Sequence, residues 1–332
     1  MATRRTKGAA RGKGAVSAEI THMNLRRFDP STIRPYSTIL FAGGRRTGKS
    51  FLMRDIIYHI RKRLYDMYVF TGTNEDDHPW KAHTPAKYVH LCREQFPTTV
   101  LASALKVQQE RKAVGRHLSA TIPPTGFIFE DLEFLTKPIW TVPGVRELWF
   151  NGRHMNTYAL CAFQYIMEIK MALRGMFDYA FFTMDNSYAS RERIRTQFGG
   201  VFPSMEMFEN IFFACTTNFK AMVLDLRATS YKIEDCVFWY RASDHGPFRV
   251  GVHDVWDRVV DEENRKKLKN ASRGVVTERV GDRMRMAINL EGYGDADTSS
   301  PDLPSPSSMG EKRLIAKKKK KKNMKEKNRK GK

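Results

Sequence analysis

The stretch from Thr38 to Ser50, TILFAGGRRTGKS, decides the fold of this chain. It begins with an apolar run, Ile39 to Ala42, that has the composition of a buried strand. The residues after this run fit the spacing G-x-x-x-x-G-K-[ST], whose fixed positions are Gly43, Gly48, Lys49 and Ser50. Apolar residues then recur every four positions, at Leu52, Ile56 and Ile60. The stretch therefore predicts a strand, a glycine-rich loop and a helix, in that order.

This combination is typical of a loop that binds the phosphates of a nucleotide. Glycines let successive backbone N–H groups wrap a phosphate chain, and the helix N-terminus adds the positive end of its dipole. Lys49 is expected to reach the β- and γ-phosphates, and the Ser50 hydroxyl to ligate Mg²⁺. The predicted nucleotide contacts are Gly43, Gly44, Arg45, Arg46, Thr47, Gly48, Lys49, Ser50 and Phe51. Arg45 and Arg46 occupy variable positions of the pattern. They could contact phosphate or DNA, or they could lie in solvent, and the sequence favours neither alternative.

Two later strand ends carry polar side chains that suit the same chemistry. The apolar run 126–129 ends in Glu130 and Asp131, and the run 157–163 ends in Gln164. A nucleotide hydrolase needs one carboxylate in the metal shell and one that orients water, which predicts Glu130 and Asp131 for these two roles. Gln164 is expected to face the γ-phosphate and to sense hydrolysis. Without the glycine-rich loop, both features would be ordinary strand ends in solvent.

The rest of the chain alternates between strand and helix patterns. Further strands are expected at 67–73, 179–185, 221–228 and 235–242, and a short apolar piece at 88–91 leads to the next helix. Helices are expected at 98–116, 166–173, 191–198, 205–215 and 262–269, and from residue 145 to a Gly-Arg-His turn at 152–154. Residues 28–36 are expected to form an extended lead-in across the domain. This alternation predicts an α/β fold with a mostly parallel sheet and helices on both faces.

Charge defines the predicted ends of the domain. The 332 residues carry a net charge of +21, of which residues 1–14 supply +5 and residues 311–332 supply +11. We expect a disordered basic arm at 1–17, the folded domain at 18–258, a charged extension at 259–290, a flexible linker at 291–310 and a lysine-rich tail at 311–332. Such tails bind polyanions, nucleic acid above all. A nuclear-import signal at Lys317 to Lys322 is a compatible alternative.

The cysteines and the hydropathy pattern exclude several other classes of protein. Cys92, Cys161, Cys215 and Cys236 lie far apart, without a C-x-x-C motif or nearby histidine ligands. We therefore expect reduced, buried thiols and neither a disulfide framework nor a cysteine zinc site. No uncharged apolar run is long enough to span a bilayer, and the N-terminus lacks a signal-peptide core. The expectation is a soluble, intracellular protein that does not bind membranes.

Four segments in order resemble a known family. They are GGRRTGKS, FIFEDL, FNGRHMNTYALCAFQ and LRGMFDYAFF, which begin at residues 43, 127, 150 and 173. Over roughly residues 35–245 the chain resembles the DNA-packaging ATPases of nucleocytoplasmic large DNA viruses. These form the poxvirus-type branch of the FtsK–HerA superfamily of ring-forming, RecA-like P-loop DNA pumps. The chain departs from the usual pattern in placing Glu130 before Asp131, because P-loop ATPases more often place Asp first.

The resemblance implies an ATPase that moves double-stranded viral DNA into a capsid, with ATP and Mg²⁺ bound. It implies catalytic roles for Lys49, Glu130, Asp131 and Gln164, with Ser50 and Glu130 at the metal. The superfamily uses an arginine upstream of the sensor strand across the subunit interface. Here this is Arg153, with Arg174 as second choice.

The same resemblance implies a homo-oligomeric ring that acts on double-stranded DNA, with a capsid or portal-vertex protein as a further partner. It places the protein in the host nucleus, in a cytoplasmic virus factory or on the virion. A helicase, another DNA-dependent ATPase or a small-molecule kinase would use the same loop. A basic nucleic-acid-binding virion protein with a regulatory nucleotide site is the alternative of another class.

Overall fold

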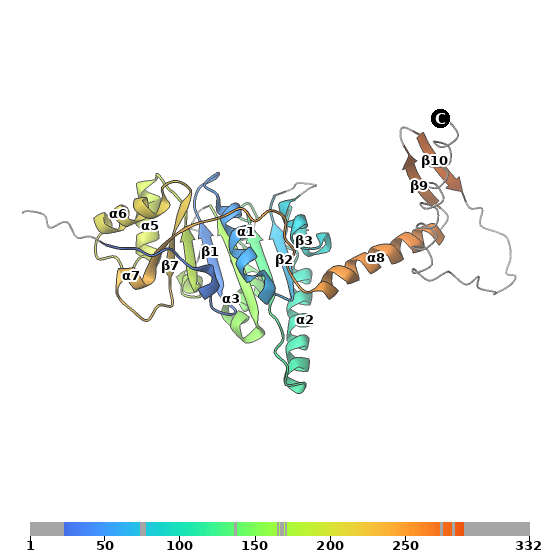
Figure 1. Ribbon diagram of the computed structural model, residues 1–332, viewed down its shortest axis with the longest axis horizontal. Coiled ribbons are helices and arrows are strands. Elements are labelled where there is room, and N and C mark those ends of the chain that lie inside the picture. Colours follow the sequence, from blue (N-terminus) through green and yellow to red (C-terminus); the bar gives the residue numbers. More distant parts are fainter. Residues whose placement is uncertain are drawn as a thin grey trace, which may run out of the picture. The chain divides into compact units, whose positions relative to one another are not determined.

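The structure of the chain is a computed structural model (Figure 1). It describes residues 23–73, 78–135, 138–164, 166, 169, 171–272, 275–280 and 283–288. The predicted arm at 1–17, the linker at 291–310 and the tail at 311–332 lie outside these residues. Backbone contacts divide the chain after Asn264 into two units, and the first carries the predicted site.

The first unit is built on one eight-stranded sheet. Its strands are β1 Thr38–Ala42, β2 Asp66–Thr71, β3 Val89–Leu91, β4 Thr125–Glu130, β5 Thr157–Phe163, β6 Tyr179–Phe182, β7 Lys220–Asp225 and β8 Val237–Arg241. They lie in the order β3-β2-β4-β5-β1-β6-β7-β8. The pairs from β3 to β6 are parallel, and β6, β7 and β8 pair antiparallel. The predicted mostly parallel sheet is therefore confirmed.

The register brings the predicted site residues to one edge of the sheet. β5 lies between β1 and β4, with Glu130 beside Ala162 and Ala42 beside Phe163. Because these three strands are parallel and in level register, their carboxyl ends open onto the same edge. The glycine-rich loop, the acidic pair and Gln164 follow directly from those ends.

Helices cover both faces of this sheet, as predicted. The helices are α1 Lys49–Ile60, α2 Thr98–His117, α3 Pro143–Met155, α4 Met171–Arg174, α5 Tyr188–Phe198, α6 Met205–Thr216, α7 Ile233–Cys236 and α8 His253–Ser272. Short 3-10 turns lie at Pro30–Thr32, Arg61–Arg63, Pro79–Ala82, Ala86–Tyr88 and Ile139–Thr141. The apolar stripe of α1 packs in one core, and α2, α3, α5 and α6 pack in the core on the opposite face.

The predicted Gly-Arg-His turn is wrong, because residues 152–154 are the last full turn of α3. The helix ends only at Asn156, a left-handed residue with φ of 55°. Gly152 serves close packing and not a turn. A Cβ there would lie 2.8 Å from the Thr157 hydroxyl, and that hydroxyl donates to the Gly152 carbonyl at 3.0 Å.

The late part of the chain agrees with the expectation in one place and differs in another. The strands expected at 221–228 and 235–242 are confirmed as β7 and β8, and they pair antiparallel at one side of the sheet. The helix expected at 262–269 is part of the longer α8, and two strands follow it as an antiparallel pair, β9 Val275–Val280 and β10 Arg283–Ile288. The start of the second strand, RMRM, carries the two-residue alternation of strands, whereas VVTERV does not.

The lead-in crosses the sheet as expected but is not extended throughout, since Pro30–Thr32 form a 3-10 turn in it, and the four cysteines are buried as expected. Phe28 is buried against the rings of Tyr179, Phe181 and Tyr240, so the chain before β1 is fastened across the sheet. All four cysteines are buried and free of disulfides. Burial raises the pKa of the Cys215 thiol to about 11, which keeps it protonated and unreactive at neutral pH. No helix in the described ranges combines the length and the apolar character needed to cross a membrane.

Candidate nucleotide-binding site

The loop between β1 and α1 has a backbone that favours glycine. Gly48 is the N-cap of α1 with φ of 92°, in the left-handed region. Gly43 has φ of 150°, and a Cβ on it would lie 1.9 Å from the Thr183 hydroxyl oxygen. That hydroxyl lies 2.6 Å from the hydroxyl of Thr47, so a hydrogen bond joins the loop to the residue that follows β6. The glycines of the motif are thus explained by local geometry.

Lys49 is held inside this loop. Its ammonium donates to the carbonyls of Gly43 at 2.7 Å and Gly44 at 2.9 Å, and its side chain is buried. Burial lowers the pKa of Lys49, and the negative charges of Asp131, Glu133 and Glu130 oppose that shift. The lysine therefore stands as a fixed cation between the loop and an acidic wall.

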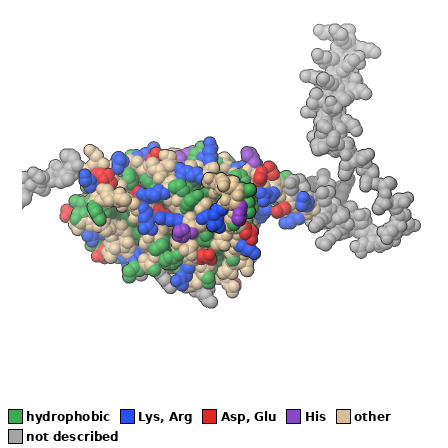
Figure 2. Space-filling view, turned by 90° about the horizontal axis from the view of Figure 1, so that it is seen from below, with side chains coloured by type: hydrophobic (Ala, Val, Ile, Leu, Met, Phe, Trp, Pro, Cys, Tyr) green, Lys and Arg blue, Asp and Glu red, His purple; other side chains and the backbone are tan. Residues whose placement is uncertain are grey.

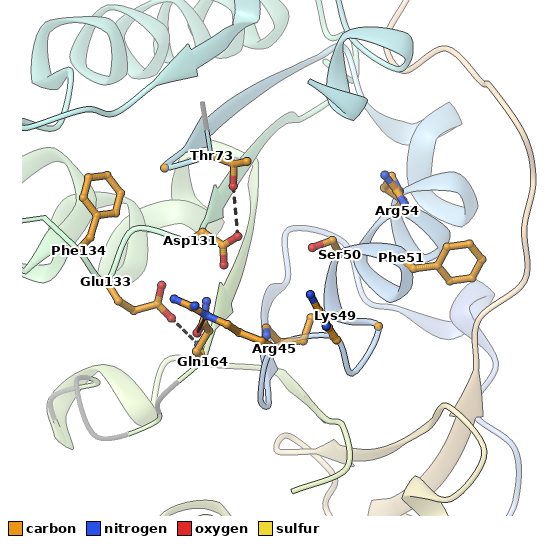
Figure 3. Close-up of a pocket in the computed structure, with 13 residues that line it drawn as sticks. Arg45, Lys49, Ser50, Phe51, Arg54, Thr73, Asp131, Glu133, Phe134 and Gln164 are labelled. Atoms are coloured by element: carbon orange, nitrogen blue, oxygen red, sulfur yellow. Dashed lines mark hydrogen bonds between the residues drawn. The ribbon is translucent and has the colours of Figure 1, made fainter. Parts of the chain in front are cut away.

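An open cleft of about 810 Å³ lies at this edge of the sheet (Figure 3). Its lining comprises Arg45, Arg46, Gly48, Lys49, Ser50, Phe51, Arg54, Gly72, Thr73, Asp131, Glu133, Phe134 and Gln164. Figure 3 places Ser50 and Asp131 on opposite walls, with their side chains turned toward the same space. The cleft thus brings together loop residues, Asp131 and Gln164, which lie far apart in the sequence.

Asp131 is positioned by an unusual backbone conformation and by the two residues that follow β2. It has φ of 52°, and its carboxylate accepts a hydrogen bond from the Thr73 hydroxyl at 3.3 Å. Gly72 donates its N–H to the Glu130 carbonyl at 3.0 Å. There is no space for a Cβ on Gly72, because it would lie 2.0 Å from the Asp131 carbonyl oxygen. The glycine after β2 therefore lets the acidic segment turn into the cleft.

Glu130 points elsewhere. It is 4% exposed, lies outside the cleft lining, and accepts a hydrogen bond from the indole N–H of Trp80 at 2.6 Å. The alternation of β4 explains this direction, since Ile128 belongs to the core on the α1 side and Glu130 follows it on the same face. The metal-shell role of Glu130 remains a prediction, and its observed partner is Trp80.

Gln164 connects the loop with an acid that the sequence analysis missed. Its amide oxygen accepts from Arg45 Nε at 3.1 Å, and its backbone N–H donates to the Glu133 carboxylate. Arg45 thus contacts the predicted sensor and does not simply extend into solvent. Glu133 lines the cleft as well. Its only signal in the sequence was its place three residues after Glu130, in the segment EDLE.

The two arginines considered for action in trans lie outside this cleft. Both precede the amino ends of strands, Arg153 before β5 and Arg174 before β6, whereas the cleft is at the carboxyl ends. Arg153 forms an ion pair with the buried Asp178, although its own side chain is 57% exposed. Arg174 Nε donates to the Ile169 carbonyl at 2.9 Å. A role of either arginine in a neighbouring subunit remains a prediction.

The cleft suits a magnesium–nucleotide complex. Mg²⁺ prefers oxygen ligands in octahedral geometry and usually keeps several waters, so one or two protein oxygens suffice. The Ser50 hydroxyl and the carboxylates of Asp131 and Glu133 supply such oxygens from opposite walls. The basic residues of the loop side, Arg45, Arg46, Lys49 and Arg54, would face the phosphates.

Comparisons with known proteins point to viruses. No family model matches the chain. It is 28% identical over 237 residues to uncharacterized protein L437 of Acanthamoeba polyphaga mimivirus, which covers 70% of this chain and 82% of that protein. It is 27% identical over 206 residues to uncharacterized protein 088R of Invertebrate iridescent virus 3, which covers 62% and 76%. These relatives are proteins of nucleocytoplasmic large DNA viruses, the viral group that the motifs indicated.

A solved structure is also similar. It is the genome-packaging NTPase B204 of Sulfolobus turreted icosahedral virus 2 in complex with ATP-gammaS, with a TM-score of 0.44 and 12% identity. The alignment covers 63% of this chain and 99% of that chain. The phosphate-binding loop between β1 and α1 and the order β4-β5-β1 confirm the predicted P-loop NTPase fold in the present chain.

We predict that Gly72→Ala damages the cleft. The added methyl would overlap the Asp131 carbonyl and the Phe134 ring, so the acidic segment must move, at a cost of about 1–3 kcal/mol in unfolding free energy. Gly200→Ala is the matched control, because no atom lies within 4 Å of a Cβ there. Urea denaturation and nucleotide binding would be measured on both variants. Equal behaviour of the two would show that the contact at Gly72 does not constrain Asp131.

Proposed function

We propose that this P-loop NTPase is an ATP-driven motor that moves double-stranded viral DNA into the capsid. The observation that carries the ATPase part is the convergence of Lys49, Ser50, Asp131 and Gln164 in one cleft. These residues come from β1 with its loop, from β4 and from β5, which are neighbouring parallel strands. A phosphate-binding loop opposite carboxylates and a polar strand end is the arrangement that phosphoryl transfer to water requires.

The loop side of the cleft would hold the triphosphate. Backbone N–H groups at the start of α1 and the Lys49 ammonium would neutralise the β- and γ-phosphates. The ammonium now bonds to the carbonyls of Gly43 and Gly44, so it would exchange these partners for phosphate oxygens. Bound Mg²⁺ would neutralise charge on the same phosphates, with Ser50 and Asp131 as the residues placed to hold it or its waters.

The acidic side of the cleft would orient the attacking water. Asp131 and Glu133 both face the cleft, and each is fixed by a hydrogen bond, from Thr73 and from the Gln164 backbone respectively. A fixed carboxylate accepts a water proton in a defined direction, which favours in-line attack on the γ-phosphate. We assign water orientation to Asp131, with Glu133 as the second carboxylate of this wall.

Gln164 is placed to report hydrolysis. Its side chain bonds to Arg45 of the phosphate loop, while its backbone bonds to Glu133 of the acidic wall. Loss of the γ-phosphate changes the charge that Arg45 faces, and the Arg45–Gln164 hydrogen bond links that change to β5. The Arg45–Gln164 hydrogen bond is thus the contact through which loss of the γ-phosphate would reach Gln164.

The DNA part of the proposal rests on charge and on the viral relatives. Residues 1–14 and 311–332 supply +16 of the net charge of +21, and the rest of the chain is still basic. Over the middle of the face drawn in Figure 2, Lys and Arg side chains gather on the folded unit. Each phosphate neutralised by such a residue releases counterions, which favours binding to duplex DNA of any sequence.

The central test is ATP hydrolysis with and without duplex DNA. We expect DNA to stimulate turnover by the full chain, and Lys49→Ala to abolish turnover because the phosphates lose their fixed cation. A chain that ends near residue 290 should need more DNA for the same stimulation and should show a flatter salt dependence. Turnover that ignores DNA would favour a nucleotide-regulated virion protein. Strand separation without translocation would favour a helicase.

A second test separates the three acids. Asp131→Asn should retain ATP binding but lower kcat about 100- to 10,000-fold, because the amide cannot accept the water proton. Glu133→Gln and Glu130→Gln are matched isosteric variants, one inside the cleft and one bonded to Trp80 outside it. If Asp131→Asn hydrolyses ATP normally and Glu130→Gln does not, Glu130 and not Asp131 orients the attacking water.

A third test concerns Arg153. If it acts in a neighbouring subunit, Arg153→Ala should bind ATP but fail to hydrolyse it, and mixing it with Lys49→Ala should restore turnover. Arg227→Ala is the matched control, since Arg227 also bonds to Asp178, at 3.1 Å. Equal loss in both variants, without restoration on mixing, would identify the Asp178 ion pairs as purely structural.

A further inference from the structure

Three side chains of metal-ligand type converge away from the nucleotide cleft. They are Asp55 and His59 on α1 and His245 in the segment after β8, and their ligand atoms all lie within 4.8 Å of one another. Both imidazoles direct Nε2 at the same carboxylate oxygen. Asp55 Oδ1 lies 2.5 Å from His245 Nε2 and 3.7 Å from His59 Nε2. Two imidazoles and a carboxylate that point at the same place are the kind of ligands that bind divalent transition metals.

The spacing of these atoms is close to that of a metal site. Bonds of about 2.0–2.2 Å at tetrahedral angles place neighbouring ligand atoms about 3.4 Å apart. The two distances to Asp55 Oδ1 bracket this value. A shift of His245 Nε2 by about 1 Å would bring its distance from Asp55 Oδ1 to that of a metal site, within the rotamer freedom of one side chain.

The surroundings hold two of the ligands in place. The other carboxylate oxygen of Asp55 accepts a hydrogen bond from the Tyr240 hydroxyl at 2.5 Å. The His245 ring stacks on Tyr58 with ring centroids 3.6 Å apart and planes 2° from parallel. Outer partners of this kind orient metal ligands. Asp55 itself is 2% exposed, and a carboxylate so deeply buried needs a compensating charge.

One side of the cluster is open. A cavity of about 310 Å³ borders Asp55 and His245, with Arg54, His83 and Asp244 also in its lining. Three protein ligands beside a cavity leave room for water or a further ligand as the fourth partner. This cavity is separate from the nucleotide cleft, although both include Phe51 and Arg54.

We propose that Asp55, His59 and His245 form a binding site for a divalent transition-metal ion of the Zn²⁺ class. The ion would fasten the segment after β8 to α1, the helix whose first residues are Lys49 and Ser50. In the binding step His245 Nε2 gives up the proton that lies between it and Asp55 and takes the ion in its place, while the neutral ring keeps one proton on Nδ1 and any second proton goes to solvent. The site stands on these residues alone and does not depend on the proposed ATPase activity.

The test is titration of the full chain, stripped with a chelator and free of nucleotide, with ZnCl₂ in a calorimeter. We expect one equivalent to bind and the melting temperature to rise. His245→Ala and His59→Ala should each abolish this binding, whereas the matched control His117→Ala, an exposed histidine outside the cluster, should retain it. The described cysteines are all buried, so they do not compete for the added ion.

Two further measurements keep the outcome decisive. Co²⁺ added to the stripped chain should give the visible absorption of nitrogen and oxygen ligation, and Tyr240→Phe should weaken Zn²⁺ binding about tenfold through loss of its bond to Asp55. If His245→Ala does not fold by circular dichroism, His59→Gln decides, because the His59 side chain is 34% exposed and tolerates replacement. Absence of stoichiometric binding to the unmutated chain, or undiminished Zn²⁺ binding by both histidine variants, would overturn the proposal and leave a hydrogen-bond network.

Discussion

The level register of β4, β5 and β1 is the constraint on which the rest of the site depends. Side chains that follow these strands share a cleft only because Glu130 pairs with Ala162, and Phe163 with Ala42. A slip of one residue in either ladder would turn the strand-end residues to the opposite face. The register is specified by burial on both faces, since β1, β4 and β5 are buried at every position. Hydrophobic packing along the strands thus sets the position of the polar groups at their ends.

Opposite charges meet across this cleft because the chain places them on different walls. Lys49, Arg45, Arg46 and Arg54 belong to the loop and α1, whereas Asp131 and Glu133 follow β4. Burial lowers the pKa of Lys49, and the acids of the other wall oppose that shift by favouring its charged form. A triphosphate with its metal carries both signs, negative toward the loop and positive toward the acids. The polarity of the cleft matches that distribution and gives the bound complex one orientation.

Local patterns predicted those parts of the site that local geometry controls. The glycine-rich loop, the apolar stripe of α1 and the strand before Gln164 follow from spacing and period, and the structure has all three. The direction of Glu130 could not be predicted, because β4 is buried on both faces and the partner Trp80 comes from a stretch with no periodic pattern. Glu133 was missed because it lies in a loop, where no strand or helix periodicity marks a residue as facing the site. The Gly-Arg-His segment misled since its glycine serves close packing against Thr157, a contact that composition does not reveal.

The helix α1 links two regions that the sequence keeps far apart. Its first residues line the nucleotide cleft, and Asp55 and His59 contact residues of β8 and of the segment that follows it, up to 190 positions later. A helix rises about 1.5 Å per residue, so Ser50 and Asp55 are separated by only about 7.5 Å along a rigid rod. A change of charge at the phosphate loop that displaced α1 would have to carry the cluster of Asp55, His59 and His245 with it or break its contacts. Because Tyr240 and His245 fix α1 to β8 and the segment after it, strain at the phosphates would pass into the far end of the sheet.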